Sequence, residues 1–229
     1  FERIYGECPY KSPTDMGVNM AGYSITDDEV CREASRQEVV RRYFKTACLM
    51  RQGRADEQEL NRLELLMRTL SIDPSIRKTV PAALEVARRT NQPATAIELP
   101  DGRVVTGKTS SLLGASSAAL LNALKILSDI PDELKLISPS VIEPIQHLKV
   151  DHMGNHNPRL HTDEVLIALA ISAATDPIAA RAMDALSDLK DCDAHSTVIL
   201  SQVDDGVFKK LGMNVTCEPV YQNKKLYHK

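Results

Sequence analysis

Tryptophan is absent from this sequence, and aromatic residues make up only 4% of its 229 residues. Basic residues are not in excess, because 28 Lys and Arg stand against 31 Asp and Glu and the net charge is −3. A protein that binds nucleic acid through its phosphates needs a basic surface. The composition therefore predicts no nucleic-acid partner and leaves small phosphorylated ligands open.

Long apolar runs are also missing. The longest, VLIALAISAA at residues 165–174, is well below the roughly 18 residues that span a bilayer. The five cysteines are widely spaced and include no C-x-x-C pair, which indicates neither a disulfide framework nor a zinc knuckle. We expect no membrane segment and a cytoplasmic location.

The first 25 residues predict a long ordered loop. The chain opens on FERIYGECPY, without an initiator Met or an apolar signal core, and we expect it to continue from an N-terminal half that is missing. Residues 6–25 are rich in Gly and Pro but also carry apolar side chains that need burial. The alternative is a linker trailing from the absent part.

Residues 26–92 predict a helical subdomain. Thr26 and Glu29 form a capping box that starts its first helix. Gly53 is expected to end this helix in the left-handed conformation. A second helix follows, and Asp73 with Pro74 opens a third helical stretch that Pro81 interrupts or restarts and that ends near Asn91.

An α/β subdomain is predicted for residues 93–229. ATAIEL, a Pro-Asp-Gly turn and RVVTG predict a β-hairpin. Further on, STVILS at 196–201 and the segment that starts at Asn214 predict two strands joined by a short helix, a parallel β-α-β unit. The fold class is therefore α/β.

The hairpin overlaps the pattern G-x-x-x-x-G-K-T at residues 102–109, which matches a Walker A phosphate loop. A phosphate loop must wrap its backbone N–H groups around an anion. Here Gly102 belongs to the turn and the next residues to a strand, so we interpret the match as accidental.

The second half of that pattern still predicts an anion site. Gly107 and a Lys/Thr/Ser cluster lead into a predicted helix, and free N–H groups at a helix start favour negative charge. Gly107 would permit a close backbone approach to the ligand. The alternative is that the serines only cap and pack the helix. The candidate anion-binding residues are Lys108, Thr109, Ser110 and Ser111, with Lys11, Ser12 and Thr14 as partners from the first loop.

Three histidines fall within the predicted loop DHMGNHNPRLHT. Metal binding, active-site hydrogen bonding and solvated or structural histidines all remain open, but the spacing matches no metal motif and Arg159 argues against a cation. We therefore predict no metal. The further cleft candidates are Asp15, Asn19, His152, His156 and His161.

Cys192 and His195 suggest a Cys–His nucleophile at first sight. A reactive thiol needs an electropositive setting, and Cys192 is flanked by Asp191 and Asp193. We interpret Cys192 as structural.

The segments CPYKSPTDMGVNMAG, LMRQGRADEQELNRLELLM, ELPDGRVVTGKTSSLLGASSAALLNALK and DHMGNHNPRLHTDEVLIALAISAA resemble the bacterial family called domain of unknown function 1846. The resemblance implies the C-terminal half of a longer protein, with a helical part and a three-layer α/β/α subdomain of cytidine-deaminase-like topology. It implies no established activity and no catalytic residues to carry over.

Two functions follow as hypotheses. The chain contributes an anion-binding cleft to an enzyme that acts on a small phosphorylated or nucleotide-like ligand, completed by its own N-terminal half. The alternative is a non-catalytic module for ligand binding or self-association, and we expect a homo-oligomer. No cofactor is assigned.

Overall fold

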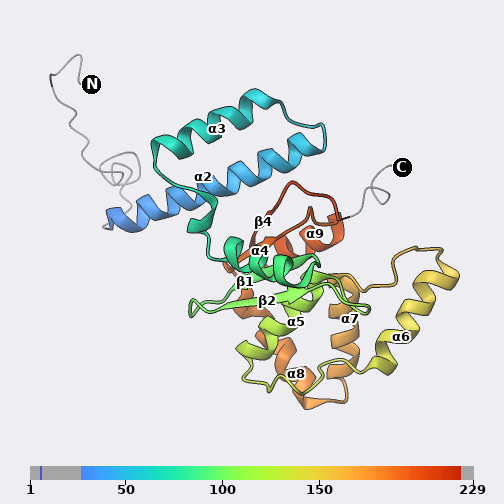
Figure 1. The fold of residues 1–229 in the computed structure, drawn as a ribbon. Coiled ribbons are helices and arrows are strands. Elements are labelled where there is room, and N and C mark those ends of the chain that lie inside the picture. The colour runs from blue at the N-terminus through green and yellow to red at the C-terminus, as the bar shows by residue number, and fades with distance from the viewer. Residues whose placement is uncertain (1–5, 7–26, 223–229) are drawn as a thin grey trace.

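The computed structural model describes Gly6 and residues 27–222. These residues form eight α-helices and one four-stranded sheet of order β2-β1-β3-β4 (Figure 1). The chain is thus a mixed α/β fold. The α-helices are α2 (Asp28–Arg51), α3 (Glu57–Thr69), α4 (Thr79–Thr90), α5 (Ala115–Leu127), α6 (Pro139–His147), α7 (Thr162–Ala173), α8 (Pro177–Asp184) and α9 (Gln202–Lys210), and the strands are β1 (Ala94–Glu98), β2 (Val104–Lys108), β3 (Asp193–Ser196) and β4 (Asn214–Cys217).

Helices α2 and α3 form an antiparallel layer above the rest of the chain (Figure 1). The N-cap of α2 is Asp27, whose side chain accepts from the N–H groups of Glu29 and Val30. The predicted capping box at Thr26 is therefore one residue too early, because a carboxylate caps as well as a hydroxyl. Gly53 ends the helix region at φ 71°, as predicted. Apolar residues of α2 and α3 meet α4 in a small core of Val40, Phe44, Met67 and Val80.

The third helical stretch is divided. Asp73 caps only a short 3-10 turn, Pro74–Ile76, and α4 starts afresh at Thr79. Pro81 falls in the first turn of α4, where a missing N–H costs nothing. The helix ends at Asn91 in the left-handed conformation, as predicted.

The predicted hairpin is confirmed. β1 and β2 pair antiparallel, from Ala94 opposite Lys108 to Glu98 opposite Val104. Gly102 lies in the turn at φ 81°. No phosphate loop can form there, because β2 takes up residues 104–108.

The predicted parallel β-α-β unit is also confirmed, as β3–α9–β4. Its first strand is Asp193–Ser196, however, and the predicted strand 196–201 starts where the real one ends. The polar segment DAHS forms the strand because it lies between two neighbours, β1 and β4, and buries Ala194 and His195. Tertiary pairing overrides the weak local preference.

Figure 1 places α4 on one face of the sheet and α5 on the other. The main core lies on the α5 side and joins the sheet to α5, α7, α8 and α9 through residues such as Ile97, Leu124, Leu169, Ala182 and Phe208. α6 contains Pro144 and is followed by a π-helical turn, Leu148–His152. Within the described residues, no helix is both long and apolar enough to cross a membrane.

Candidate functional site

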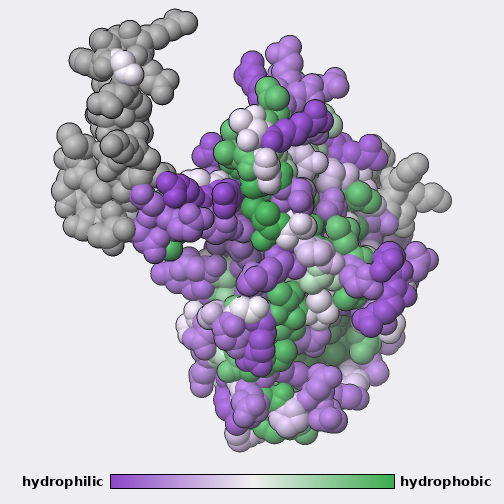
Figure 2. All heavy atoms as spheres, turned by 60° about the vertical axis from the view of Figure 1, so that its left-hand side comes forward, coloured by the Kyte–Doolittle hydropathy of each residue, from purple (hydrophilic) through white to green (hydrophobic). Residues whose placement is uncertain are grey.

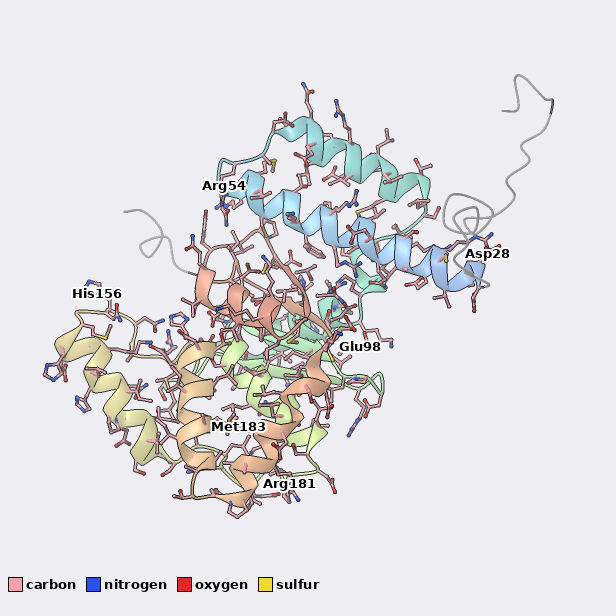
Figure 3. The ribbon with its side chains drawn as sticks, turned by 180° about the vertical axis from the view of Figure 1, so that it is seen from behind. Asp28, Arg54, Glu98, His156, Arg181 and Met183 are labelled. Atoms are coloured by element: carbon pink, nitrogen blue, oxygen red, sulfur yellow. The ribbon has the colours of Figure 1, made fainter. Side chains whose placement is uncertain are left out.

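A cleft of about 1240 Å³ separates the α2–α3 layer from β4, α9 and the segment before α9. Its upper wall comes from α2, α3 and the turn between them, which carries Arg54. Its lower wall includes Ile199–Gln202 and Met213–Cys217. Figure 3 shows Arg54 at the end of α2 that is remote from Asp28, on the α9 side of the molecule.

The lining of the cleft is basic although the protein as a whole is acidic. Six basic residues and three acidic residues line it, whereas the whole chain carries a net charge of −3. Glu38 is paired with Arg41 and Arg42, and Asp205 with Lys209. Within the described part of the chain, the side chains of Lys45, Arg54 and Arg62 form no ion pair or hydrogen bond, so their charges remain available to a ligand.

The cleft also offers an apolar wall. Leu49 and Leu63 on one side and Ile199, Met213 and Val215 on the other line it. Polar residues cover most of the face in Figure 2, with apolar patches between them. A concave site that combines an apolar wall with a few charged groups is typical of small-molecule binding.

Cys48 and Cys217 line the same cleft, but neither is a nucleophile. Burial raises the pKa of each thiol to about 12. The Cys48 Sγ donates to the carbonyl oxygen of Cys217 at 3.2 Å. Both groups are therefore neutral thiols at neutral pH, and the chemistry of the cleft does not depend on a thiolate.

Sequence reasoning placed the helix start at Lys108–Ser111, and this is wrong. α5 begins at Ala115 with Gly114 as its N-cap. The N–H of Thr109 donates to Pro93 O, and the N–H of Ser110 to Leu113 O. Ser110 Oγ accepts from the N–H groups of Leu112 and Leu113. These groups form a local turn, because a serine side chain competes with the helix for backbone donors.

The role expected for Gly107 is also different. Its missing Cβ would lie 2.1 Å from the backbone nitrogen of Ala119 in α5. The close approach is thus between β2 and α5, not between the backbone and a ligand.

The loop at Ser110 contacts the histidine loop and α6 through side-chain hydrogen bonds. Arg159 Nε donates to Ser110 O at 2.7 Å, and Gln146 Nε2 to Ser111 O at 3.2 Å. Leu113 and Leu160 form a parallel β-bridge.

The three histidines do not converge. His161 lies at the start of α7, where Nδ1 is 3.0 Å from Asp204 Oδ2. His152 and His156 are exposed, and Figure 3 shows His156 in the outlying loop beside α6. In the part of the chain that the structure describes, no three His, Cys, Asp or Glu side chains are grouped as metal ligands would be.

Asp204 is the centre of a buried polar network around His161. Its Oδ1 accepts from the N–H and Oγ1 of Thr162, and its Oδ2 accepts from Ser201 Oγ. Burial alone would raise the pKa of Asp204, but the hydrogen bonds from His161, Thr162 and Ser201 outweigh it and hold the pKa below its ordinary value. Ser201 also lines the cleft, so the network and the cleft share one residue.

Cys192 is a structural residue, as predicted. It is buried, and its pKa is raised to about 11 by burial and then by the carboxylates of Asp193 and Asp191. His195 does not contact it but bonds Thr216 Oγ1 and packs on the ring of Phe44.

Lys11, Ser12, Thr14, Asp15 and Asn19, which sequence reasoning added to the site, lie outside the described residues, as does most of the predicted loop 1–25. Lys45, Arg54 and Arg62 were missed. The signal for them was the RQGR turn and the run of Arg and Lys along α2, which sequence reasoning interpreted only as a helix and its stop.

Two family models match the sequence. The N-terminal model of DUF1846, a domain of unknown function, matches residues 1–71, and the C-terminal model matches residues 75–227. The expectation that the chain represents the C-terminal half alone is therefore too narrow. The two matches meet between α3 and α4, so one wall of the cleft comes from each.

Curated relatives point to the same family. A UPF0371 protein of Streptococcus pneumoniae (strain Hungary19A-6) is 54% identical over 228 residues, which is 100% of this chain and 46% of the relative. A UPF0371 protein of Streptococcus thermophilus (strain CNRZ 1066) has the same identity and coverage. The chain thus spans about half the length of the curated relatives it matches.

Proposed function

The chain belongs to the DUF1846 family, and we propose that its cleft between α2–α3 and β4–α9 binds a small phosphorylated ligand of nucleotide-like size. The observation that carries the proposal is the set of three unpaired cations, Lys45, Arg54 and Arg62, in the wall of an otherwise acidic protein.

Phosphate is the anion that this arrangement favours. The guanidinium groups of Arg54 and Arg62 each offer a planar fork that bonds two phosphate oxygens, and Lys45 adds a point charge. The volume of about 1240 Å³ exceeds what a single phosphate needs and is sufficient for a nucleotide. The apolar wall at Ile199, Met213 and Val215 would accept the uncharged part of the ligand.

The location of the cleft supports the proposal as well. Ligand sites occur preferentially where two structural units meet, and this cleft lies between the parts matched by the two family models. It also runs along the whole length of β4, where Met213–Cys217 supply one wall.

The site predicted at Lys108, Thr109, Ser110 and Ser111 is a competing position for the anion. Lys108 lies beside Arg89 and Asn122 in a smaller hollow of about 440 Å³, but the N–H groups of Thr109 and Ser110 are already used. We therefore place the ligand in the larger cleft. The cytidine-deaminase-like topology is likewise our inference, supported by the helices on both faces of the sheet.

Self-association is the second candidate function. Ile167 and Ile171 are 60% and 58% exposed on one stripe of α7, and two such stripes packed together would bury them. Light scattering coupled to size exclusion measures this directly. A monomer at micromolar concentration contradicts it.

The binding proposal is tested by calorimetric titration of the chain with ATP and with pyrophosphate. Arg62→Ala removes one cation from the cleft wall. Because a hydrogen bond to a charged group is worth about 1.5–3 kcal/mol, affinity for either probe should fall roughly tenfold or more.

Arg68→Ala is the matched control. Arg68 lies on the same helix as Arg62 and is exposed, but it does not line the cleft. The two variants remove the same charge from the same element, so an equal loss of affinity would indicate a general charge effect and contradict the proposal. Unchanged affinity in Arg62→Ala would contradict it as well.

A further inference from the structure

Strand β2 forms one edge of the sheet that the described residues build, because the strand order is β2-β1-β3-β4. Its hydrogen bonds to β1 alternate along the strand. The N–H of Thr109 donates to Pro93 O, and Arg103 O accepts from the N–H of Leu99. In an antiparallel pair every second residue points its backbone groups at the same neighbour. Residues 105 and 107 therefore also bond β1, and residues 104, 106 and 108 point the other way.

The outer side of β2 is an open edge. Asn122 Nδ2 in α5 donates to Thr106 O at 2.9 Å, which confirms the outward direction of that carbonyl group. The outward N–H groups of Val104, Thr106 and Lys108 make no hydrogen bond to the described part of the chain. Unpaired N–H groups at regular spacing along an edge strand are donors for an added strand.

A groove of about 440 Å³ lies at this edge. Its lining comes from the end of α4, from the last residues of β2 and from Asn122 of α5. Figure 1 shows the β1–β2 hairpin between these two helices. None of the lining residues also lines the large cleft, so the edge is a separate surface.

The groove is positively charged. Arg89 of α4 and Lys108 of β2 line it, and no acidic residue does. Neither side chain forms an ion pair or a hydrogen bond with the residues that the structure describes, whereas the neighbouring Arg88 is paired with Glu85. The charge of the groove is therefore not compensated, although the whole protein is acidic.

Both cations lie on the same side of the edge. Side chains alternate along a strand, and the Cβ position of Gly107 faces Ala119 of α5. The side chain of Lys108 therefore points to the opposite side of the sheet, where α4 carries Arg89. Every second side chain of an added strand would point to this side. Carboxylates at alternate positions of that strand would meet the two cations.

We propose that the outer edge of β2 binds an extended acidic peptide segment of a partner protein as an added strand. The peptide's C=O groups accept from the N–H groups of Val104, Thr106 and Lys108. Its carboxylates, at alternate positions, pair with Arg89 and Lys108. The backbone bonds hold the segment, and the two cations select for its charge. This surface works without the cleft and without a ligand in it.

Protection of the edge is the alternative explanation. A lysine on an edge strand discourages pairing with other chains, and Asn122 covers one carbonyl group. Protection accounts for Lys108 but not for a second cation from another element, or for the groove between them. The cations also disfavour a second copy of β2, because it would bring its own two cations to the same edge.

Amide hydrogen exchange, measured by NMR on the unmodified chain, tests the edge first. The N–H groups of Val104, Thr106 and Lys108 should exchange faster than those of Val105 and Gly107, which bond β1. Equal protection of both sets would show that the edge is already covered and would overturn the proposal.

The probe for binding is a five-residue peptide of alternating Glu and Val with blocked ends. At about ten times its Kd it should slow exchange of the three outward N–H groups roughly tenfold. A peptide of alternating Lys and Val should have no effect. No slowing by the acidic peptide, or equal slowing by both peptides, contradicts the proposal, and the first of these results is the one that edge protection predicts.

N-methylation separates backbone pairing from attraction between charges. In one isomer of the acidic peptide the Glu nitrogens are methylated, and in the other the Val nitrogens are. Only one of these sets faces β2 in an added strand, so one isomer should bind and the other should not. Equal binding would show that charge alone holds the peptide, and loss of binding in both isomers would also contradict an added strand.

Arg89→Ala tests the choice of an acidic partner. It should weaken binding of the acidic peptide roughly threefold, an amount typical of an exposed ion pair. Arg88→Ala is the matched control, because Arg88 is the next residue of the same helix, is exposed and does not line the groove. It should leave the affinity unchanged. Equal losses in the two variants would indicate a general charge effect and overturn the assignment.

Discussion

The Cβ that Gly107 lacks would lie 2.1 Å from the backbone nitrogen of Ala119. No side chain fits in this space, since β2 and α5 touch there by their backbones. The contact joins the outer strand of the sheet to the helix that covers it, so it fixes how the main core closes.

Gly107→Ala should therefore destabilise the chain by about 3 kcal/mol or more, because backbone atoms cannot give way as a side chain can. Gly206→Ala is the control. Gly206 lies inside α9, and a Cβ there meets nothing within 4 Å. Alanine has the higher helix propensity, so this variant should be stabilised by about 1 kcal/mol. Urea unfolding measures the stability of both variants. Equal free energies of unfolding would show that the β2–α5 contact is not tight.

Arg77 should be one of the most sensitive residues of the chain. Its side chain is fully buried, with Nη1 3.3 Å from Asp193 Oδ2 and Nη2 donating to Asn214 O. Arg77→Ala leaves a carboxylate without its cation and should cost about 3 kcal/mol or more. Arg103 forms an exposed ion pair with Asp101. Arg103→Ala should therefore lower the free energy of unfolding by less than about 1 kcal/mol. Thermal and urea unfolding of the two variants would contradict this if their losses were similar.

Stability should fall as the pH drops from about 6.5 toward 5. His195 is fully buried, and burial lowers its pKa below 6.5 in the folded state. The unfolded chain therefore binds more protons below 6.5, which favours unfolding there. His195→Gln should flatten this part of the stability profile, and His152→Gln, an exposed control, should not. A slope that persists in His195→Gln would assign it to other groups.

The contribution of His161 to stability depends on pH in the opposite direction. Its pKa is raised in the folded state, so its contribution is complete below 6.5 and is lost as the pH rises through the folded value. The free energy of unfolding of His161→Asn should therefore deviate most from that of the unmodified chain at pH 5.5, and the deviation should shrink by pH 8.5. A deviation that is constant with pH would indicate lost packing instead.

Glu59 is the acidic residue of the cleft whose side chain forms no ion pair in the described chain. If the cleft binds phosphate, removal of this negative charge should strengthen the binding. Glu59→Gln should tighten the binding of pyrophosphate roughly threefold, by an amount typical of exposed charge interactions. Calorimetry at two salt concentrations checks this, since the gain should shrink as salt screens the charges. Weaker binding in Glu59→Gln would contradict the assigned electrostatics.

Local signals in the sequence predicted the hairpin and most helices. A Pro-Asp-Gly turn between β-branched residues specifies a hairpin without help from the rest of the chain, and Gly53 and Asn91 marked helix ends correctly. The polar strand at Asp193–Ser196 could not be predicted, because it exists only between β1 and β4. The start of α5 was missed because Ser110 closes a turn with Leu112 and Leu113 instead of capping a helix.

The candidate site was predicted only in part. The loops that carry Ser110 and Arg159 were both predicted to contribute to the site, and the structure joins them by a hydrogen bond that the sequence did not predict. The basic cleft was not, since Lys45, Arg54 and Arg62 come from three places on α2, its turn and α3. A cleft between a helical layer and a distant strand depends on long-range packing that no local pattern encodes.

The crystal structure of the chain with 8-bromo-ATP tests the central claim most directly, because the anomalous signal of bromine locates the base and the phosphates follow from it. We predict phosphate oxygens within about 2.7–3.0 Å of the guanidinium groups of Arg54 and Arg62, with the base against Ile199 and Met213. A nucleotide bound at Lys108–Ser111, or a cleft that stays empty while the ligand binds elsewhere, would contradict the account.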